Sequence, residues 1–231
     1  MLIVSRPWSV RLALSCPAVL SLAAILAAAL PVAARAQTEA RPLTPFERQM
    51  ARVDLGLTAS GQITPSDTGT TTYPQVETIV NKASTTVGFL ATLRWIKSPL
   101  IGFEGNFSQA RFNENFTNLI GGAQTKVNEE TLGYVAHTPK KIFGVQPFGG
   151  VGLGTIAFHP TRDGGQGLPF QYRAVYYYSV GLDAPLLGPN FGLRLNFREI
   201  FYKAPDFIQN YLTIQQHTTT YEPGVGFYLR F

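Results

Sequence analysis

The sequence contains one cysteine, Cys16, in 231 residues. A disulfide framework within the chain is therefore excluded, and no set of cysteines is available to ligate a metal. Because Cys16 falls in an N-terminal segment that we expect to be removed, thiolate chemistry is excluded as well. Long apolar runs are also missing after residue 36, where no stretch approaches the roughly 20 residues that a membrane-spanning helix needs.

Charge is scarce too, since charged residues form 14% of the chain against about 25% of an average soluble domain. The formal net charge is +5, and Arg6, Arg11 and Arg35 near the N-terminus supply much of it. The rest of the chain has no basic excess of the kind that binds nucleic acid, so we expect no nucleic-acid partner. Glycine, at 22 residues, and aromatic side chains, at 12%, are abundant by contrast. This composition is typical of a membrane β-barrel.

The first 36 residues have the pattern of a secretory signal peptide. Arg6 and Arg11 precede an apolar stretch over residues 12–30, and Ala34-Arg35-Ala36 forms an A-x-A cleavage site before Gln37. We therefore expect cleavage at this point and export of the remaining chain.

Two alternatives for this segment fit less well. An uncleaved helical anchor is long enough to span a membrane, but Pro31 and the small residues after it favour removal. A lipoprotein is disfavoured because most of the apolar core follows Cys16, whereas it should precede the modified cysteine. We predict a signal peptide over 1–36, a periplasmic lead-in over 37–51 and one barrel domain over 52–231.

The rest of the chain is made of segments of alternating polarity. From Val225 to Phe231, odd positions are aliphatic or aromatic and even positions are glycine, tyrosine or arginine, which predicts a strand with one apolar face. Similar alternation occurs in seven earlier segments. We predict strands over 52–63, 84–96, 100–112, 126–138, 145–158, 172–186, 191–202 and 225–231.

The connections between these segments alternate strictly between long and short. This alternation is typical of an up-and-down membrane barrel, which has long loops outside the cell and short periplasmic turns. An even number of strands places both termini in the periplasm. The long connections are 64–83, 113–125, 159–171 and 203–218, and the short ones are 97–99, 139–144 and 187–190.

The composition of the polar face indicates which side meets lipid. It consists of glycine, serine, threonine and asparagine with scattered charges, and small residues suit the crowded interior of an eight-stranded barrel. A soluble lipocalin-like barrel would turn its apolar face inward and would need a charged outer face. We therefore expect the apolar face to meet lipid.

Aromatic residues near the strand ends are expected to form two girdles at the membrane surfaces. Phe112 and Phe158 are out of phase with the apolar faces of their strands, and each would need a bulge to reach lipid. The predicted girdle residues are Trp95, Phe112, Phe158, Phe191 and Phe201.

Through its strand count, its loop alternation and its phenylalanine-terminated last strand, the sequence resembles the small eight-stranded outer-membrane barrels of the OmpA/OmpX-like kind. The resemblance implies an all-β, antiparallel, up-and-down transmembrane barrel in the outer membrane of a Gram-negative cell. It also implies that Phe227, Leu229 and Phe231 form the signal read by the barrel assembly machinery. The chain stops at the barrel, so the peptidoglycan-binding role of a full OmpA-type protein is not implied.

Charged residues on the interior face must be paired, because an isolated buried charge costs several kcal/mol. Strand direction predicts that Arg94 faces Glu104 and that Asp183 faces Arg194 across periplasmic turns. It also predicts that Asp54 faces Arg230 where the last strand closes on the first. We expect these residues to plug the barrel, with a narrow gated ion path as the alternative. The predicted lumen network is Asp54, Arg94, Glu104, Asp183, Arg194, Arg198 and Arg230.

No catalytic, cofactor or metal site is predicted. The lipid A deacylase family pairs a histidine with a serine two residues later, whereas Thr161 and Thr219 stand at that distance from His159 and His217. His137 precedes a periplasmic turn. The glycine-rich run 149–154 is not followed by a helix, so it is no nucleotide-binding loop.

The sequence thus predicts a non-enzymatic outer-membrane protein with a structural or surface-interaction role. A small pore is the first alternative, and a lipid-modifying enzyme is a weaker one. The expected partners are outer-membrane lipid and lipopolysaccharide, the assembly machinery, and an extracellular partner bound through the long loops. Residues 207–214 are unusually apolar for such a loop.

Overall fold

The chain divides into two units, Met1–Leu43 and Thr44–Phe231. The computed structural model describes nearly all of the second. The predicted signal peptide and residues 37–42 of the predicted lead-in lie outside the described residues. The described residues are 43–71, 76–117, 122–188, 190–207, 212–213 and 217–231.

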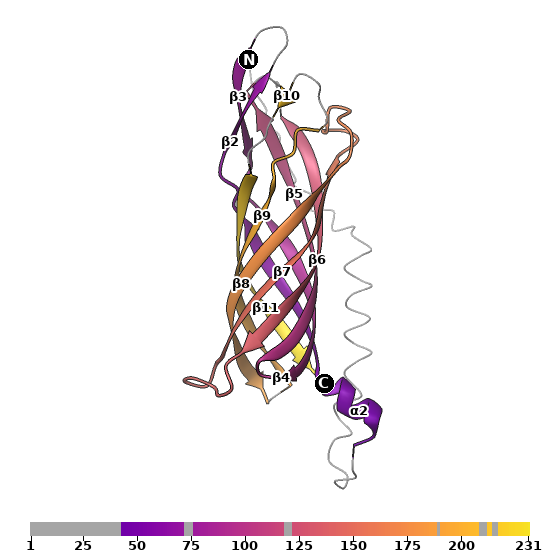
Figure 1. Ribbon diagram of the computed structural model, residues 1–231, viewed down its shortest axis with the longest axis vertical. Helices are drawn as coiled ribbons and strands as arrows, with labels where there is room; N and C mark the ends of the chain where they lie inside the picture. Colours follow the sequence, from indigo (N-terminus) through magenta and orange to yellow (C-terminus); the bar gives the residue numbers. More distant parts are fainter. Residues whose placement is uncertain (1–42, 72–75, 118–121, 189, 208–211, 214–216) are drawn as a thin grey trace, which may run out of the picture. The chain divides into compact units, whose positions relative to one another are not determined.

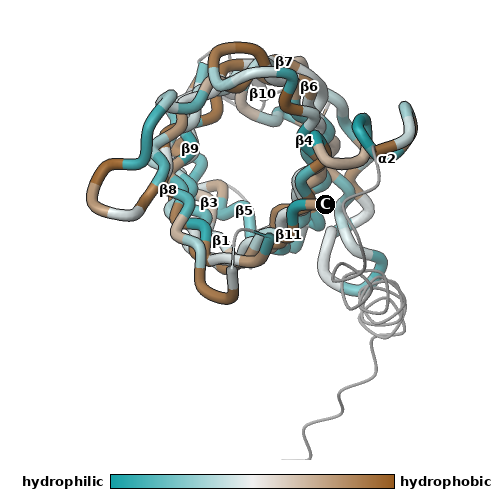
Figure 2. Tube along the Cα trace, turned by 90° about the horizontal axis from the view of Figure 1, so that it is seen from below, coloured by the Kyte–Doolittle hydropathy of each residue, from teal (hydrophilic) through white to brown (hydrophobic). Residues whose placement is uncertain are grey.

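Eight antiparallel strands form a closed barrel (Figures 1 and 2), which confirms the predicted fold class. Strands that follow one another along the barrel wall pair in the order β1-β4-β5-β6-β7-β8-β9-β11, and β11 returns to pair with β1. The strands are β1 Val53–Gln62, β4 Thr86–Ser98, β5 Ile101–Phe116, β6 Ala123–His137, β7 Gln146–Pro160, β8 Gln171–Leu187, β9 Phe191–Lys203 and β11 His217–Arg230.

All eight predicted strands are present, and the last is longer than predicted because it begins at His217. Three further strands lie in segments that were predicted as loops: β2 Asp67–Thr71, β3 Glu77–Ala83 and β10 Leu212–Thr213. They extend the sheet beyond one end of the barrel, where β3 pairs with the end of β5 (Figure 1). The long connections therefore carry an ordered sheet of their own.

A short helix, α2 Pro45–Met50, precedes the first strand in the predicted lead-in. Thr44 caps it, because its hydroxyl accepts from the Glu47 N–H while the Glu47 carboxylate accepts from the Thr44 N–H. Pro45 suits the first helical position, which needs no N–H donor. Within the described residues, no helix is long and apolar enough to cross a membrane.

The first and last strands close the barrel at one seam. Asp54 lies opposite Arg230 in the ladder, and the pairing continues to Ser60 opposite Gly224. The Phe231 N–H donates to the Val53 carbonyl at 3.2 Å, so the ladder continues to the last residue of the chain. The start of β1 and the end of β11 therefore share the rim that carries the short turns, as an even strand number requires.

A belt of exposed apolar side chains surrounds the lower part of the barrel. Leu132 leaves 74% of its surface exposed. An apolar surface of this extent is not stable in water, so it is the lipid-facing surface, and the predicted orientation of the two faces is confirmed. The belt includes Leu55, Val87, Leu93, Phe103, Leu132, Val151, Leu153, Tyr176, Val180, Leu195, Val225 and Phe227.

The interior is packed closely enough that some positions tolerate no side chain. Gly152 on β7 faces inward, and a Cβ atom placed there would lie 2.5 Å from Cε1 of Tyr177 on the adjacent strand. Glycine is required here because the Leu132 carbonyl oxygen and the Tyr177 ring already occupy the space of a side chain. The glycines on the inner face, which the sequence suggested, therefore leave room for the larger side chains of neighbouring strands.

The polarity of the two faces reverses along the strands as they leave the belt. On β5, Phe103 faces outward and Glu104 inward near the periplasmic end. Farther along the same strand, Phe112 is buried inside while Arg111 and Asn113 are exposed outside. An inner apolar face with an outer polar face is the arrangement of a water-soluble barrel. The reversal therefore indicates where the wall leaves the membrane on the extracellular side.

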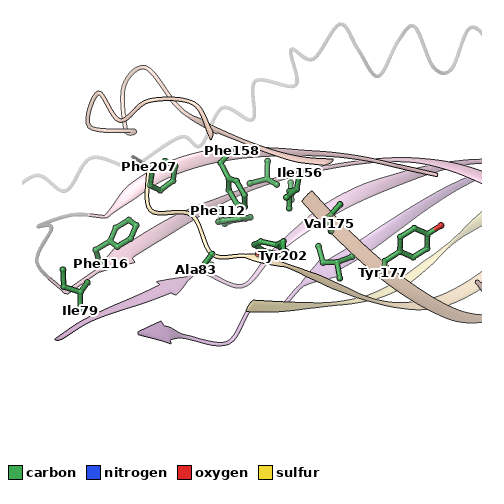
Figure 3. Close-up of a cluster of buried hydrophobic side chains, with 14 residues drawn as sticks. Ile79, Ala83, Phe112, Phe116, Ile156, Phe158, Val175, Tyr177, Tyr202 and Phe207 are labelled. Carbon is green, nitrogen blue, oxygen red and sulfur yellow. The ribbon is translucent and has the colours of Figure 1, made fainter. Parts of the chain in front are cut away.

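The girdle prediction is wrong for Phe112 and Phe158. They are 7% and 0% exposed, and both belong to an apolar core that fills the upper end of the barrel (Figure 3). The ladders through both positions run without a register shift, so no bulge turns either ring outward. The core also contains Ile79, Phe116, Ile156, Val175, Tyr202 and Phe207.

The other three girdle residues lie on the outer face. Trp95 stacks on Phe103 with ring centres 6.2 Å apart, and Phe191 stacks on Phe227 at 5.6 Å. Phe201 packs against Tyr178 at 6.0 Å. Trp95 and Phe191 belong to the end of the barrel that carries the short turns, and Phe201 belongs to the opposite end.

Candidate functional site: the filled lumen

The lower lumen is held by an ion cluster around Arg194. The Arg194 Nε donates to Asp183 at 2.7 Å, and its Nη2 donates to both oxygens of Asp54 at 3.0 Å. Asp183 lies directly opposite Arg194 on the β8–β9 ladder, whereas Asp54 reaches it from β1 on the other side of β11. Arg230 closes the cluster with a 3.2 Å contact to Asp54. The contact between Arg194 and Asp54 was not foreseen from the sequence.

A second pair joins this cluster from the opposite wall. Arg94 and Glu104 lie directly opposite on β4 and β5, with the Arg94 Nε 2.8 Å from the Glu104 carboxylate. The Arg94 guanidinium lies 4.0 Å from the centre of the Phe148 ring, and its Nη1 lies 4.0 Å from Asp183. These contacts connect the two walls across the lumen. The cluster is therefore a single network that includes both predicted hairpin pairs.

A second cluster lies above the first, around Arg198. Arg198 donates to Glu129 and to Glu222, each at 2.6 Å, and its guanidinium lies 4.6 Å from the centre of the Tyr177 ring. The Tyr177 hydroxyl donates to Glu104 at 2.8 Å, which connects the upper cluster to the lower one.

The sequence prediction included Arg198 but missed both of its partners. Glu222 lies directly opposite Arg198 on β11, in the part of that strand that precedes the predicted segment 225–231. Pro223 faces outward within the strand. Glu129 lies on β6, the predicted strand with the least regular pattern. Extending the last strand past Pro223 would have placed Glu222 on the inner face.

The two clusters together bring four arginines into contact with five carboxylates. All of these side chains are buried except Arg230, whose side chain is 28% exposed at the periplasmic mouth. The arginines neutralise most of the carboxylate charge inside the barrel, which is the condition for burying so many charges.

Above the upper cluster the filling changes from ionic to apolar. A cavity of about 10 Å³ separates Glu129 and Glu222 from the rings of Phe112 and Tyr202, enough for about one water molecule. Phe158 then packs against Tyr202 and Phe207, with ring centres 5.7 and 6.5 Å away. The barrel contents therefore change from ion pairs to an aromatic core over a short distance.

Two carboxyl groups, Glu114 and Asp67, are buried beyond the belt on the extracellular side. Glu114 on β5 is 2% exposed beneath β3, where Asn81 hydrogen-bonds to it. Burial raises the pKa of Glu114 to about 7, and the nearby Asp67 carboxylate adds to the rise. Burial raises the pKa of Asp67 as well. These groups make the stability of the extension dependent on pH.

Glu114→Gln is expected to flatten the pH dependence of stability. Because the folded-state pKa of Glu114 lies above the unfolded value of 4.5, its neutral form contributes stability at low pH that is lost as pH rises through about 7. The loss amounts to at most roughly 3 kcal/mol. The free energy of urea unfolding in detergent, measured from pH 5 to pH 8, should fall for the wild type and change less for Glu114→Gln.

Glu130→Gln is the matched control, because Glu130 is an exposed carboxylate on the outer face of β6. This variant should keep the wild-type pH profile. A difference between Glu114→Gln and the wild type that is the same at pH 5 and pH 8 would contradict the assignment.

The three histidines of the described chain lie far from one another. His137 is buried in the lower lumen, 3.9 Å from Asp183, while His159 packs against the Phe170 ring and His217 is exposed. Among the described residues, no group of three histidine, cysteine, aspartate or glutamate side chains could hold a metal ion.

No protein-family model matches the chain, and no curated protein matches it. Among solved structures, it is similar to Neisserial surface protein A, at 10% identity and a TM-score of 0.52, over 78% of this chain and 97% of that one. It is also similar to outer membrane protein OprG from Pseudomonas aeruginosa, at 13% identity and a TM-score of 0.53, over 78% of this chain and 94% of that one. With its apolar belt and its charged interior, the chain has the fold of the small eight-stranded β-barrels of bacterial outer membranes.

Proposed function

We propose that this protein is a non-conducting, non-enzymatic outer-membrane barrel with a structural and surface-interaction role. The observation that carries the proposal is the filling of the lumen at three successive levels. Arg194 is the centre of the first level, Arg198 of the second, and Phe158 of the third. The contacts at each level join strands that are not neighbours in the barrel wall.

The chemistry of this filling favours a plug over a channel. Ions pass through pores lined by charged side chains that bind them weakly enough to release them. Here the arginines and carboxylates are engaged with one another at 2.6–3.2 Å. An ion that entered from the periplasm would have to break these pairs and then cross the apolar core. Both steps are unfavourable.

Conductance in a planar lipid bilayer tests the plug directly. The wild-type chain should show no discrete conductance steps, since the ion clusters and the apolar core lie one above the other across the lumen. The double variant Phe158→Ala/Tyr202→Ala should remain closed as well, because the ion clusters below are intact. Reproducible single-channel steps from the wild type would favour the small-pore alternative.

The extracellular end of the barrel wall supports the surface-interaction part of the proposal. On the outer face of β5, β6 and β7, Arg111 lies directly opposite Lys126, and Lys126 lies directly opposite His159. Like charges directly opposite one another, such as Arg111 and Lys126, destabilise a sheet, and an anion bound between them would offset that cost. These three side chains lie close to the outer boundary of the membrane, where lipopolysaccharide carries its phosphate groups. We therefore include lipopolysaccharide among the proposed partners, together with the assembly machinery at the Phe231 end.

A further inference from the structure

A hollow of about 170 Å³ opens at the periplasmic mouth, below the lower ion cluster. It lies between the residues before β1, the turn from β4 to β5, and the ends of β6 and β11. Arg52, Lys97 and Arg230 all line it. None of the described lining residues carries a carboxylate, so the hollow is positively charged on three sides.

The acids nearest to the hollow are already engaged. Asp54 and Asp183 lie behind Arg230, and Arg194 binds both at 2.7–3.0 Å. Within the described part of the chain, neither Arg52 nor Lys97 has a carboxylate in ion-pair range. The Arg52 guanidinium makes only a 3.4 Å contact with the Gln49 amide. These cations are therefore available to an anion from outside the protein.

Buried nitrogen atoms in the same place also lack partners. His137 lines the hollow and is 3% exposed, yet neither of its ring nitrogens has a hydrogen-bond partner in the described structure. The Nε of Arg230 is likewise buried without one. A buried donor without an acceptor is unfavourable, because it has lost its hydrogen bonds to water. A ligand with several oxygen acceptors would remove that cost.

The position of the hollow indicates where such a ligand comes from. Trp95 lies beside it, where its indole N–H points to Gln49 and its ring stacks on Phe103. Tryptophan at the lower edge of the belt marks the membrane interface. Ala51, Ile96 and Pro99 are the apolar residues of its lining. A headgroup in the periplasmic leaflet would reach the hollow while its acyl chains remained in lipid.

We propose that this hollow binds a phosphate group, presented by the headgroup of an anionic phospholipid in the periplasmic leaflet. Arg52 and Lys97 supply the free charge, and His137 and Gln146 supply polar contacts deeper in the hollow. Basic pockets at the edge of a membrane protein bind phospholipid headgroups in this way.

Native mass spectrometry of the folded full chain, released from vesicles of phosphatidylglycerol and phosphatidylcholine, tests the proposal. The wild type should retain phosphatidylglycerol in preference to phosphatidylcholine. Arg52→Ala/Lys97→Ala should reduce that retention by at least about tenfold, because charge-assisted contacts are lost. Heat-modifiable gel mobility shows whether each variant is folded.

Lys140→Ala/Lys141→Ala is the matched control, since both lysines are exposed on the next periplasmic turn and the charge change is the same. Retention by this control at the wild-type level supports the hollow as the site. Equal retention by all three proteins, or equal loss in both variants, would overturn the proposal. Titration with inorganic phosphate, followed by ³¹P NMR in a zwitterionic detergent, distinguishes the source. Binding of inorganic phosphate without retention of phosphatidylglycerol would overturn the lipid source.

Discussion

Arg194→Ala is expected to destabilise the barrel by about 3–5 kcal/mol, the cost of leaving buried carboxylates without their cation. Arg194 is the only side chain that donates to both Asp54 and Asp183 in the described structure. After its removal, Arg230 remains near both acids but is 28% exposed at the mouth. The longer contacts that remain, 4.0 Å from Arg94 to Asp183 and 3.7 Å from Arg230 to Asp183, do not replace the hydrogen bonds that both buried carboxylates lose. The free energy of urea unfolding in detergent measures the loss.

Arg111→Ala is the matched control for Arg194→Ala. Arg111 is exposed on the outer face above the belt, so its removal should change the unfolding free energy by no more than about 0.5 kcal/mol. The double variant Arg194→Gln/Asp183→Asn should recover most of the stability, because Asp54 keeps Arg230 and Arg94 keeps Glu104. A double variant as unstable as the sum of the two single variants would argue against one shared network.

The sequence predicts most reliably the contacts that lie close to a short turn. Arg94 and Glu104 are few residues from the turn that joins their strands, so alternation and strand direction together place them opposite each other. The same reasoning applies to Asp183 and Arg194. In both cases the register is set locally, because a tight hairpin allows little slip.

Contacts that cross the lumen were not predictable in the same way. Arg194 reaches Asp54 past an intervening strand, and Arg198 reaches Glu129 from the opposite wall. These pairs depend on the tilt and stagger of the whole barrel, which no single hairpin determines. The added strands β2, β3 and β10 were missed for a related reason. They are short, and although β2 and β3 form a local hairpin, β3 pairs with β5 and β10 with β2 across long stretches of the chain.

The misplaced aromatic residues show a different limit. The prediction assumed that every large ring near an outer strand end belongs to a girdle, and it invoked a bulge to keep Phe112 and Phe158 at the lipid. The residues on either side of Phe112 already indicated otherwise. Arg111 and Asn113 are polar and take the outward-facing positions of that segment, so Phe112 must face inward. Alternation was right, and the assumption that lipid surrounds the entire strand was wrong.

Phe158→Ala is therefore expected to destabilise the extracellular end of the barrel by about 3–5 kcal/mol, as for a large aromatic residue removed from a packed core. Phe158 is fully buried and packs between Tyr202 and Phe207 (Figure 3). Its removal leaves a cavity beneath the extension that the neighbouring rings fill only in part. Limited proteolysis of the chain in lipid vesicles should show faster cleavage within residues 76–83 and 204–207.

Phe143→Ala provides the control, because Phe143 is fully exposed on a periplasmic turn and its loss should leave the cleavage rate unchanged. The two possible environments of Phe158 lead to different results. A girdle residue would lose contacts with lipid when shortened, and the extension above it would keep its packing and its resistance to protease. A core residue would lose contacts with Tyr202 and Phe207, and β3 would open with them. Unchanged proteolysis of Phe158→Ala would restore the girdle assignment, whereas faster cleavage would show that the upper barrel is held by an apolar core.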